Sequence, residues 1–278
     1  MSVDPETVQA LIADVAAHEI VPRFRDLAQN EVRQKKPGDL VTVADEAAEA
    51  HLERALTELL PGSVCLGEEA AAQDRAVLNV LDDPRPVWVV DPVDGTGNFA
   101  RGRTPFVVMV ALVEAGETQA AWIHDPIAGW TASARTGEGA WCNGERLAVA
   151  TPGSDPGALR GTLHVGSHGG AALQRRINRR RSRLGVIKSQ RCAGAEYVRL
   201  ASGEQDYALF TKLEPWDHAP GGRILTEAGG VARLLDGRPY TPTAAGAEGL
   251  LLAADEPTWR RVYAALFDET SELDTRAT

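Results

Sequence analysis

Two aspartates at the end of an apolar run are the residues of this sequence that point most directly to chemistry. Asp91 and Asp94 follow residues 87–90, whose β-branched and aromatic side chains predict a buried strand. The two carboxylates therefore lie at the carboxyl end of that strand. Pro92 stiffens the turn between them, so both side chains and the carbonyl of Val93 can converge on one point. Hard oxygen donors of this kind suit Mg²⁺ or Mn²⁺.

The next three residues are suited to binding a phosphate group. Gly95 and Gly97 permit the close approach of a ligand, and free backbone N–H groups at the start of a following helix attract an anion. A metal ion and a phosphate would then meet at one turn. For Thr96, which lies between the glycines, the alternative is an ordinary turn residue, because threonine is common in turns.

The segment Asp91-Pro-Val-Asp-Gly-Thr-Gly-Asn-Phe resembles the metal-binding signature of the inositol monophosphatase family, within the lithium-sensitive Mg²⁺-dependent phosphatases. Three further segments resemble motifs of the same family: residues 39–45, residues 67–69, and residues 216–221 with 227–230. Their order and spacing also fit, and together they span nearly the whole chain. The sequence is therefore identified as a member of this family.

The resemblance implies two Mg²⁺ ions, with Mn²⁺ as an alternative. It assigns Glu68, Asp91 and the carbonyl of Val93 to the first ion, and Asp91, Asp94 and Asp217 to the second, so that Asp91 bridges them. A third, weaker ion near Glu68 is also compatible with the family. For Asp217 the alternative is that it merely opens a helix.

The reaction implied is hydrolysis of a phosphate monoester by a metal-activated water. Thr96, paired with Glu68 or with Asp45, is similar to the group that orients this water in the family, while Asp91 holds both ions. The backbone amides of Gly95 and Thr96 would hold phosphate oxygens. In the family a lysine also lies near the metal site, and Lys35 and Lys36 compete for that role here.

The substrate contacts follow from a looser match. Gly194, Ala195 and Glu196 align with the family segment that meets the sugar or polyol, although a helix N-terminus with ordinary packing explains them equally well. Glu214 is a candidate for recognising a hydroxyl group, and Asp217 would also face the substrate. The stretch around Glu214 differs from the animal enzymes.

Several esters are therefore open as substrates. An inositol monophosphate-like compound competes with histidinol phosphate, 3′(2′),5′-bisphosphate nucleotides and fructose bisphosphate, all of which relatives with similar metal motifs use. A non-catalytic binding or regulatory protein on the same fold is an alternative of another class. The presence of Glu68, Asp91, Asp94, Thr96 and Asp217 favours catalysis.

We expect two halves of the chain to hold these residues: an α+β half, residues 1–152, and an α/β half, residues 153–278. We expect a long first helix from Pro5 to about Ala28, a helix over residues 70–81 and, in the second half, strands that include residues 185–189. The alternation of strands and helices matches the layered αβαβα sandwich of the inositol monophosphatase and fructose-1,6-bisphosphatase type.

Composition and charge argue against several other classes of protein. Of 278 residues, 44% are hydrophobic and 24% charged, and the net charge of −10 disfavours nucleic acid polymers and anionic membranes. The arginine-rich residues 175–183 are better explained as a solvated helix face or a local attractor of anionic substrate. Three cysteines and the lack of a leader or spanning segment predict a cytoplasmic protein. The family resemblance also predicts a homodimer.

Overall fold

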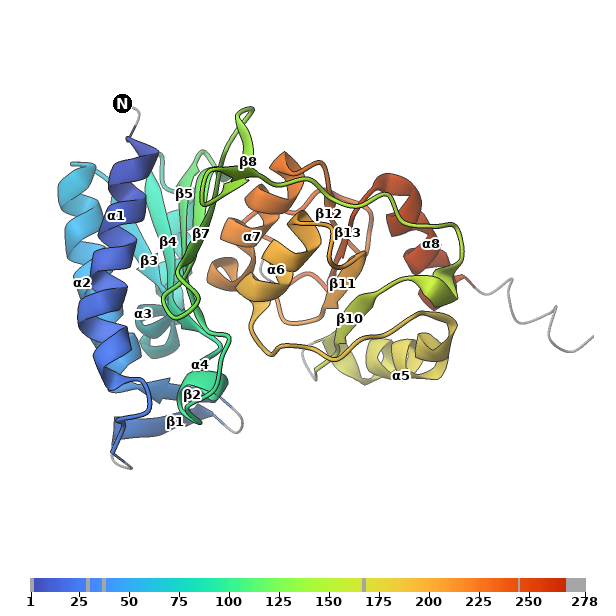
Figure 1. The fold of residues 1–278 in the computed structure, drawn as a ribbon, viewed down its shortest axis with the longest axis horizontal. Helices are drawn as coiled ribbons and strands as arrows, with labels where there is room; N and C mark the ends of the chain where they lie inside the picture. The colour runs from blue at the N-terminus through green and yellow to red at the C-terminus, as the bar shows by residue number, and fades with distance from the viewer. Residues whose placement is uncertain (1–2, 29–30, 37–38, 167–168, 245, 269–278) are drawn as a thin grey trace, which may run out of the picture.

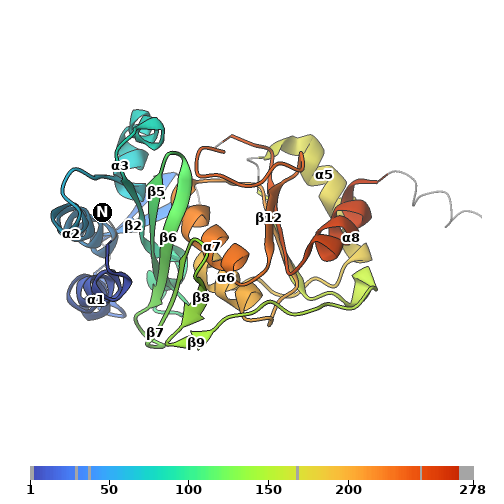
Figure 2. The ribbon, with the colours of Figure 1, turned by 90° about the horizontal axis from the view of Figure 1, so that it is seen from above.

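Helices and sheets alternate in layers across the molecule in this computed structural model (Figure 1). The structure describes residues 3–28, 31–36, 39–166, 169–244 and 246–268. A helical layer, a seven-stranded sheet, a second helical layer, a four-stranded sheet and a third helical layer follow one another. Figure 2 shows the same order from above. The predicted αβαβα sandwich is confirmed.

The first helical layer consists of α1 (Pro5–Val15) and α2 (Val43–Leu59). Both helices have capped N-termini: Asp4 accepts a hydrogen bond from the amide of Thr7, and Thr42 opens α2 in a capping box with Asp45. Their apolar faces pack together and against the first sheet.

The first helix is shorter than predicted. It continues beyond α1 only through one π-helical turn, η1 (Ala16–Ile20), and one 3-10 turn, η2 (Val21–Arg23), and does not reach Ala28. Pro22 has no N–H to extend the hydrogen-bond ladder, and Phe24 then adopts an extended backbone.

The seven-stranded sheet holds the strand on which the predicted site is built. Only β3 and β4 are parallel, and every residue of β4 is buried between α2 on one face and α7 (Pro215–Glu227) on the other. The strands, in spatial order, are β3 (Val64–Gly67), β4 (Val87–Asp94), β5 (Val107–Glu114), β6 (Glu117–Asp125), β7 (Trp130–Arg135), β8 (Gly139–Cys142) and β9 (Glu145–Arg146).

The helix predicted over residues 70–81 is two separate elements. The α-helix α3 (Glu68–Gln73) starts earlier, directly after β3, and the 3-10 helix η4 (Arg75–Asp82) follows it. Asp74 separates them because its backbone is extended and its side chain caps the second helix at the amide of Ala76.

The second half supplies the remaining layers. Helix α6 (Ala193–Ala201) joins α7 between the sheets, and α5 (Gly170–Arg180) and α8 (Glu256–Phe267) cover the outer face of the second sheet. That sheet has the order β10 (Gly161–His164), β11 (Tyr207–Phe210), β13 (Leu250–Ala253) and β12 (Val231–Leu234), and only β10 and β11 are parallel.

The predicted strand over residues 185–189 is not present as a strand. Only one residue pair, Gly161 with Val186, is in ladder register. The chain then leaves the sheet, because the next hydrogen bonds of this segment connect it to α6 rather than to a neighbouring strand.

Two short elements complete the part of the fold around the site. Strands β1 (Val32–Lys36) and β2 (Asp39–Thr42) form a hairpin, and the single helical turn α4 (Thr96–Phe99) follows β4 directly. Two further 3-10 turns are η5 (Pro156–Ala158) and η7 (Arg181–Arg183).

Residues 147–160 connect the first sheet to the second. This segment contains the predicted boundary at residue 152, and the division into two domains stays a prediction. No helix within the described ranges is long and apolar enough to cross a membrane.

Candidate active site

A cavity of ≈ 370 Å³ lies at the carboxyl end of β4, and acidic side chains line it. The four acids predicted from the sequence, Glu68, Asp91, Asp94 and Asp217, all border this cavity, as does Val93. They come from elements far apart in the chain. The structure therefore brings the predicted acids to one place.

Strand pairing explains two of these positions. Because β3 and β4 are parallel, their carboxyl ends meet at one edge of the sheet, and this places Glu68, the first residue of α3, beside Asp91. Asp91 accepts a hydrogen bond at Oδ1 from the amide of Val93 over 3.0 Å, and its side chain is almost completely buried. The third acid of this edge, Asp94, ends β4.

The second half of the chain contributes the other contacts. Asp217 lies in the first turn of α7, where an acid is favourable near the helix N-terminus. Asp94 accepts hydrogen bonds at Oδ2 from the amide of Gly194, 2.6 Å away, and from Sγ of Cys192, 3.2 Å away. The start of α6 therefore orients one acid of the site.

The electrostatics of the cavity favour a bound cation. Burial raises the pKa of Asp91, Asp94 and Asp217, in the last case to about 8, and the charge of Glu68 acts in the same direction on all three. Buried carboxylates that repel one another are stabilised by nearby positive charge, and a set of oxygen donors suits Mg²⁺ or Mn²⁺. The chemistry of this donor set therefore fits a divalent cation.

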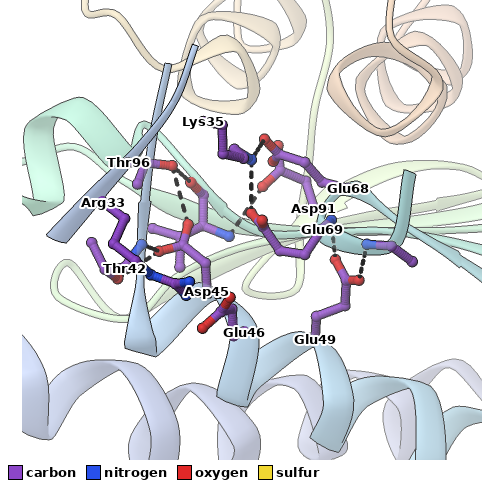
Figure 3. Close-up of polar contacts among 12 residues, drawn as sticks. Arg33, Lys35, Thr42, Asp45, Glu46, Glu49, Glu68, Glu69, Asp91 and Thr96 are labelled. Atoms are coloured by element: carbon purple, nitrogen blue, oxygen red, sulfur yellow. Dashed lines mark hydrogen bonds and ion pairs between the residues drawn. The ribbon is translucent and has the colours of Figure 1, made fainter. Parts of the chain in front are cut away.

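The conformation described here is not that of a closed metal cluster. Within the described residues no group of three or more histidine, cysteine, aspartate or glutamate side chains is arranged to hold a metal ion. Instead the Nζ of Lys35 lies 2.8 Å from Oε1 of Glu68 and 2.9 Å from Oε1 of Glu69 (Figure 3). Burial lowers the pKa of Lys35, but the two carboxylates outweigh it and hold that pKa above its usual range. The side chain of Lys36, the other predicted lysine, lies outside the described residues.

Thr96 and Asp45 form a polar pair at the wall of the cavity. The Oγ1 of Thr96 lies 2.9 Å from the carbonyl oxygen of Val93 and 3.2 Å from Oδ1 of Asp45, as Figure 3 shows. Asp45 also accepts hydrogen bonds at Oδ2 from the amide and the hydroxyl of Thr42. Burial raises the pKa of Asp45 to about 6 in spite of these hydrogen bonds.

Glu49 is a positioning residue that the sequence analysis missed. Its two carboxylate oxygens accept hydrogen bonds from the amides of Glu69 and Ala70, at 2.7 and 2.8 Å, so that α2 caps α3 and holds Glu68 in place (Figure 3). Gly67 makes room for this contact, because a Cβ there would lie 2.2 Å from the carboxyl carbon of Glu49. An acid on the apolar face of α2 was the available signal.

The sequence model of the inositol monophosphatase family matches residues 4–272. The chain belongs to the inositol monophosphatase family.

Two curated relatives of this family member are inositol monophosphatase 1 of Homo sapiens and Nus factor SuhB of Pseudomonas aeruginosa. The first is 30% identical over 230 residues, 81% of each chain. The second is 33% identical over 229 residues, 80% of this chain and 82% of the relative. The crystal structure of the extragenic suppressor protein suhB from Bartonella henselae has the same fold, with a TM-score of 0.81 and 24% identity over 95% of this chain and 98% of that one.

In this inositol monophosphatase family member the predicted substrate residue Glu196 is enclosed by protein. Its side chain has no exposed area, and its oxygens accept hydrogen bonds from Thr162, His164 and Ser189 at 2.5 to 2.7 Å and from the amide of Gln190 at 2.9 Å. In this conformation its carboxylate cannot touch a ligand. Burial raises the pKa of Glu196, but these hydrogen bonds outweigh it and hold the pKa below its usual range.

The other predicted substrate residues take different positions. The amide of Gly194 donates a hydrogen bond to Asp94. A Cβ at position 194 would lie 2.7 Å from a methyl group of Val107. Ala195 lines a separate cavity of ≈ 1250 Å³. Glu214 forms an ion pair with Arg75, whose nitrogen lies 2.9 Å from its Oε2.

Proposed function

We propose that this chain is a Mg²⁺-dependent phosphatase that hydrolyses a small phosphate monoester such as an inositol monophosphate. The observation that carries the proposal is the gathering of Glu68, Asp91, Asp94 and Asp217 around one cavity. The same cavity is bordered by Thr96, whose hydroxyl contacts Asp45. Membership of the inositol monophosphatase family supports a phosphoric monoester hydrolase.

The residues that would hold the ions are those predicted from the sequence. Glu68, Asp91 and the carbonyl of Val93 would hold one, and Asp91, Asp94 and Asp217 the other. Two divalent ions, when bound, would lower the pKa of a water molecule and stabilise the leaving oxygen. Mn²⁺ in place of Mg²⁺, and a third ion near Glu68, remain part of the proposal.

Thr96 would orient the attacking water. Its hydroxyl proton is directed to the carbonyl of Val93 or to Asp45, so its lone pairs are free to accept a hydrogen bond from that water. Fixing the direction of attack in this way lowers the entropic part of the barrier. The amides of Gly95 and Thr96 would contact the phosphate oxygens.

The organic part of the ester would be bound next to Asp217, which lines the acidic cavity, and Gly194, Ala195 and Glu214 stay predictions from the family motifs. The similarity to human inositol monophosphatase 1 supports an inositol monophosphate. Histidinol phosphate, 3′(2′),5′-bisphosphate nucleotides and fructose bisphosphate remain competing substrates.

A second candidate function is a non-catalytic regulatory role. The resemblance to a protein named Nus factor SuhB, at 33% identity, favours this alternative. The retention of the four acids and of the contact between Thr96 and Asp45 supports catalysis instead.

Release of phosphate from a panel of inositol, histidinol, sugar and nucleotide phosphates tests the proposal. Each ester is assayed with Mg²⁺, with Mn²⁺ and with a chelator, and lithium is added to the active combinations. Selective release that stops with chelator supports a metal-dependent phosphatase and identifies its ester. No release from any ester by the folded protein would support the regulatory alternative. The mass of the protein in solution tests the expected homodimer.

A further inference from the structure

Arg101 brings a positive charge to the acidic cavity without neutralising any of its acids. Its side chain is exposed and lines the cavity together with Lys212. Lys212 lies 4.0 Å from Asp217, and Lys35 is bound to Glu68, so each of these lysines is next to an acid. Among the described residues, Arg101 has no ion pair with any carboxylate.

The guanidinium of Arg101 is held in place by the backbone. Its Nη1 donates a hydrogen bond to the carbonyl oxygen of Gly97, one turn earlier. A Cβ at Gly97 would lie 3.0 Å from the same nitrogen, so an alanine there would shift the guanidinium by a few tenths of an ångström. The arginine and the glycine therefore fit each other.

The turn that carries Arg101 is itself anchored. Asn98 donates from Nδ2 to the carbonyl oxygens of Pro105 and Gln190, at 2.8 and 2.9 Å, and the amide of Arg101 donates to the carbonyl of Asn98. These bonds connect α4 to the two chain segments that contain Pro105 and Gln190. Arg101 is thus presented from a fixed backbone, which reduces the entropy lost when it binds a ligand.

An arginine in this position is suited to an oxyanion. A guanidinium carries five N–H donors in a planar fork that matches the oxygens of a phosphate or carboxylate, and only one nitrogen of Arg101 is used by Gly97. A phosphate ester that enters a cavity lined by carboxylates is repelled, and the guanidinium offsets that repulsion.

We propose that Arg101 is a substrate-binding residue that donates hydrogen bonds to an oxyanion of the phosphate ester, and that Gly97 leaves the room in which its guanidinium lies. This inference rests on the proposed phosphatase function. The oxyanion is either the phosphate that is hydrolysed or a second anionic group of the substrate. Kinetics with two kinds of ester distinguish these sources.

The experiment compares Arg101→Gln, Arg101→Lys, Gly97→Ala and a matched control, Arg103→Gln. Arg103 is an exposed arginine of the same loop that does not line the cavity. With the ester that the wild type hydrolyses best, we expect KM to rise about 10-fold or more in Arg101→Gln, which corresponds to about 1.4 kcal/mol of binding, with a much smaller change in kcat. Arg101→Lys should be intermediate, because an ammonium keeps the charge but not the fork.

Gly97→Ala and the double variant test whether Gly97 positions the Arg101 guanidinium. The alanine should raise KM, and the KM of the double variant Gly97→Ala with Arg101→Gln should be no higher than that of Arg101→Gln alone.

A monophosphate and a bisphosphate ester then locate the oxyanion. An equal rise in KM for both esters identifies the hydrolysed phosphate, and a rise for the bisphosphate only identifies a second anionic group. An unchanged KM in Arg101→Gln, or an equal rise in Arg103→Gln, overturns the proposal.

Binding of inorganic phosphate separates this inference from the proposed function. If the wild type hydrolyses no ester, the proposed function fails, and calorimetry with inorganic phosphate and Mg²⁺ then decides the role of Arg101. A Kd that is weaker in Arg101→Gln than in the wild type and in Arg103→Gln supports an anion-binding Arg101. An equal Kd in all three proteins, or no binding by the wild type, overturns it.

Discussion

Lys35 and Glu68 form an ion pair in the described structure, with Nζ of the lysine 2.8 Å from Oε1 of the glutamate. Both side chains are largely buried, with 13% and 12% of their surface exposed, so the pair is little screened by water. Glu68 is also a proposed metal ligand. The ammonium group therefore holds positive charge beside an oxygen that a divalent cation would share.

The first prediction concerns Lys35→Met. Removing the ammonium leaves the buried carboxylates of Glu68 and Glu69 without their partner, so the free energy of unfolding in chelator should fall by about 3–5 kcal/mol. Mg²⁺ should restore more stability in this variant than in the wild type. Thermal unfolding with chelator and with Mg²⁺ measures both effects. Lys188→Met, at an exposed lysine, is the control, and an equal Mg²⁺ shift in all three proteins would contradict the prediction.

The second prediction concerns Asp91→Asn. Asparagine is close to aspartate in shape but cannot supply the charge proposed to hold both ions, so kcat/KM should fall by at least about 100-fold. The melting temperature in chelator should stay the same or rise, because burial and the charge of Glu68 already disfavour the ionised carboxylate of Asp91 and raise its pKa. Phosphate release and thermal unfolding are the two measurements. Near-normal turnover would refute the bridging role.

The third prediction separates the hydroxyl of Thr96 from its packing. Thr96→Val keeps the shape but removes the group that contacts Asp45 and the carbonyl of Val93, and kcat should fall by about 100-fold or more. Thr96→Ser retains the hydroxyl and should keep most of the activity. Steady-state kinetics on the best ester measure both variants. If serine and valine behave alike, the hydroxyl does not orient the water.

The fourth prediction concerns the pH dependence of stability at Glu196. Its pKa is below the ordinary value of 4.5 because the hydrogen bonds to the carboxylate outweigh burial. Below that ordinary value the unfolded chain takes up a proton before the folded protein does, so this stabilisation is complete above about pH 4.5 and is lost as the pH falls through the folded pKa. Glu196→Gln should cost about 1–3 kcal/mol at pH 7, because the amide keeps only one acceptor oxygen and the donors that face the other position lose theirs.

Urea unfolding of the wild type and Glu196→Gln, from pH 7 down to about 3.5, checks this prediction. The difference between the two proteins should shrink on the acid side. Glu204→Gln, whose side chain is 65% exposed, is the control and should show little difference at any pH. A difference in unfolding free energy that is independent of pH would show that the ionised carboxylate of Glu196 is not what stabilises the fold.

Local patterns in the sequence predicted much of the fold. The apolar run before Asp91, the helix start at Pro5 and the alternation of strands and helices were sufficient because they depend on neighbours in the chain. The predictions that failed concern the length, the continuity or the presence of single elements. The first helix ends early after Pro22, and residues 185–189 contribute one bridge rather than a strand, since a strand requires a partner that the local sequence does not specify.

The order and spacing of the motifs are properties of the chain, and they were enough to predict the family of this protein and the residue types of its candidate site. Which groups those residues contact depends on the tertiary structure. The Glu196 carboxylate is used inside the protein, Glu49 supports the acid of a neighbouring helix, and Arg101 folds over Gly97 beside the acids. Each of these contacts depends on how separate elements pack, or on which side chains leave room for one another, and the linear spacing of residues contains neither.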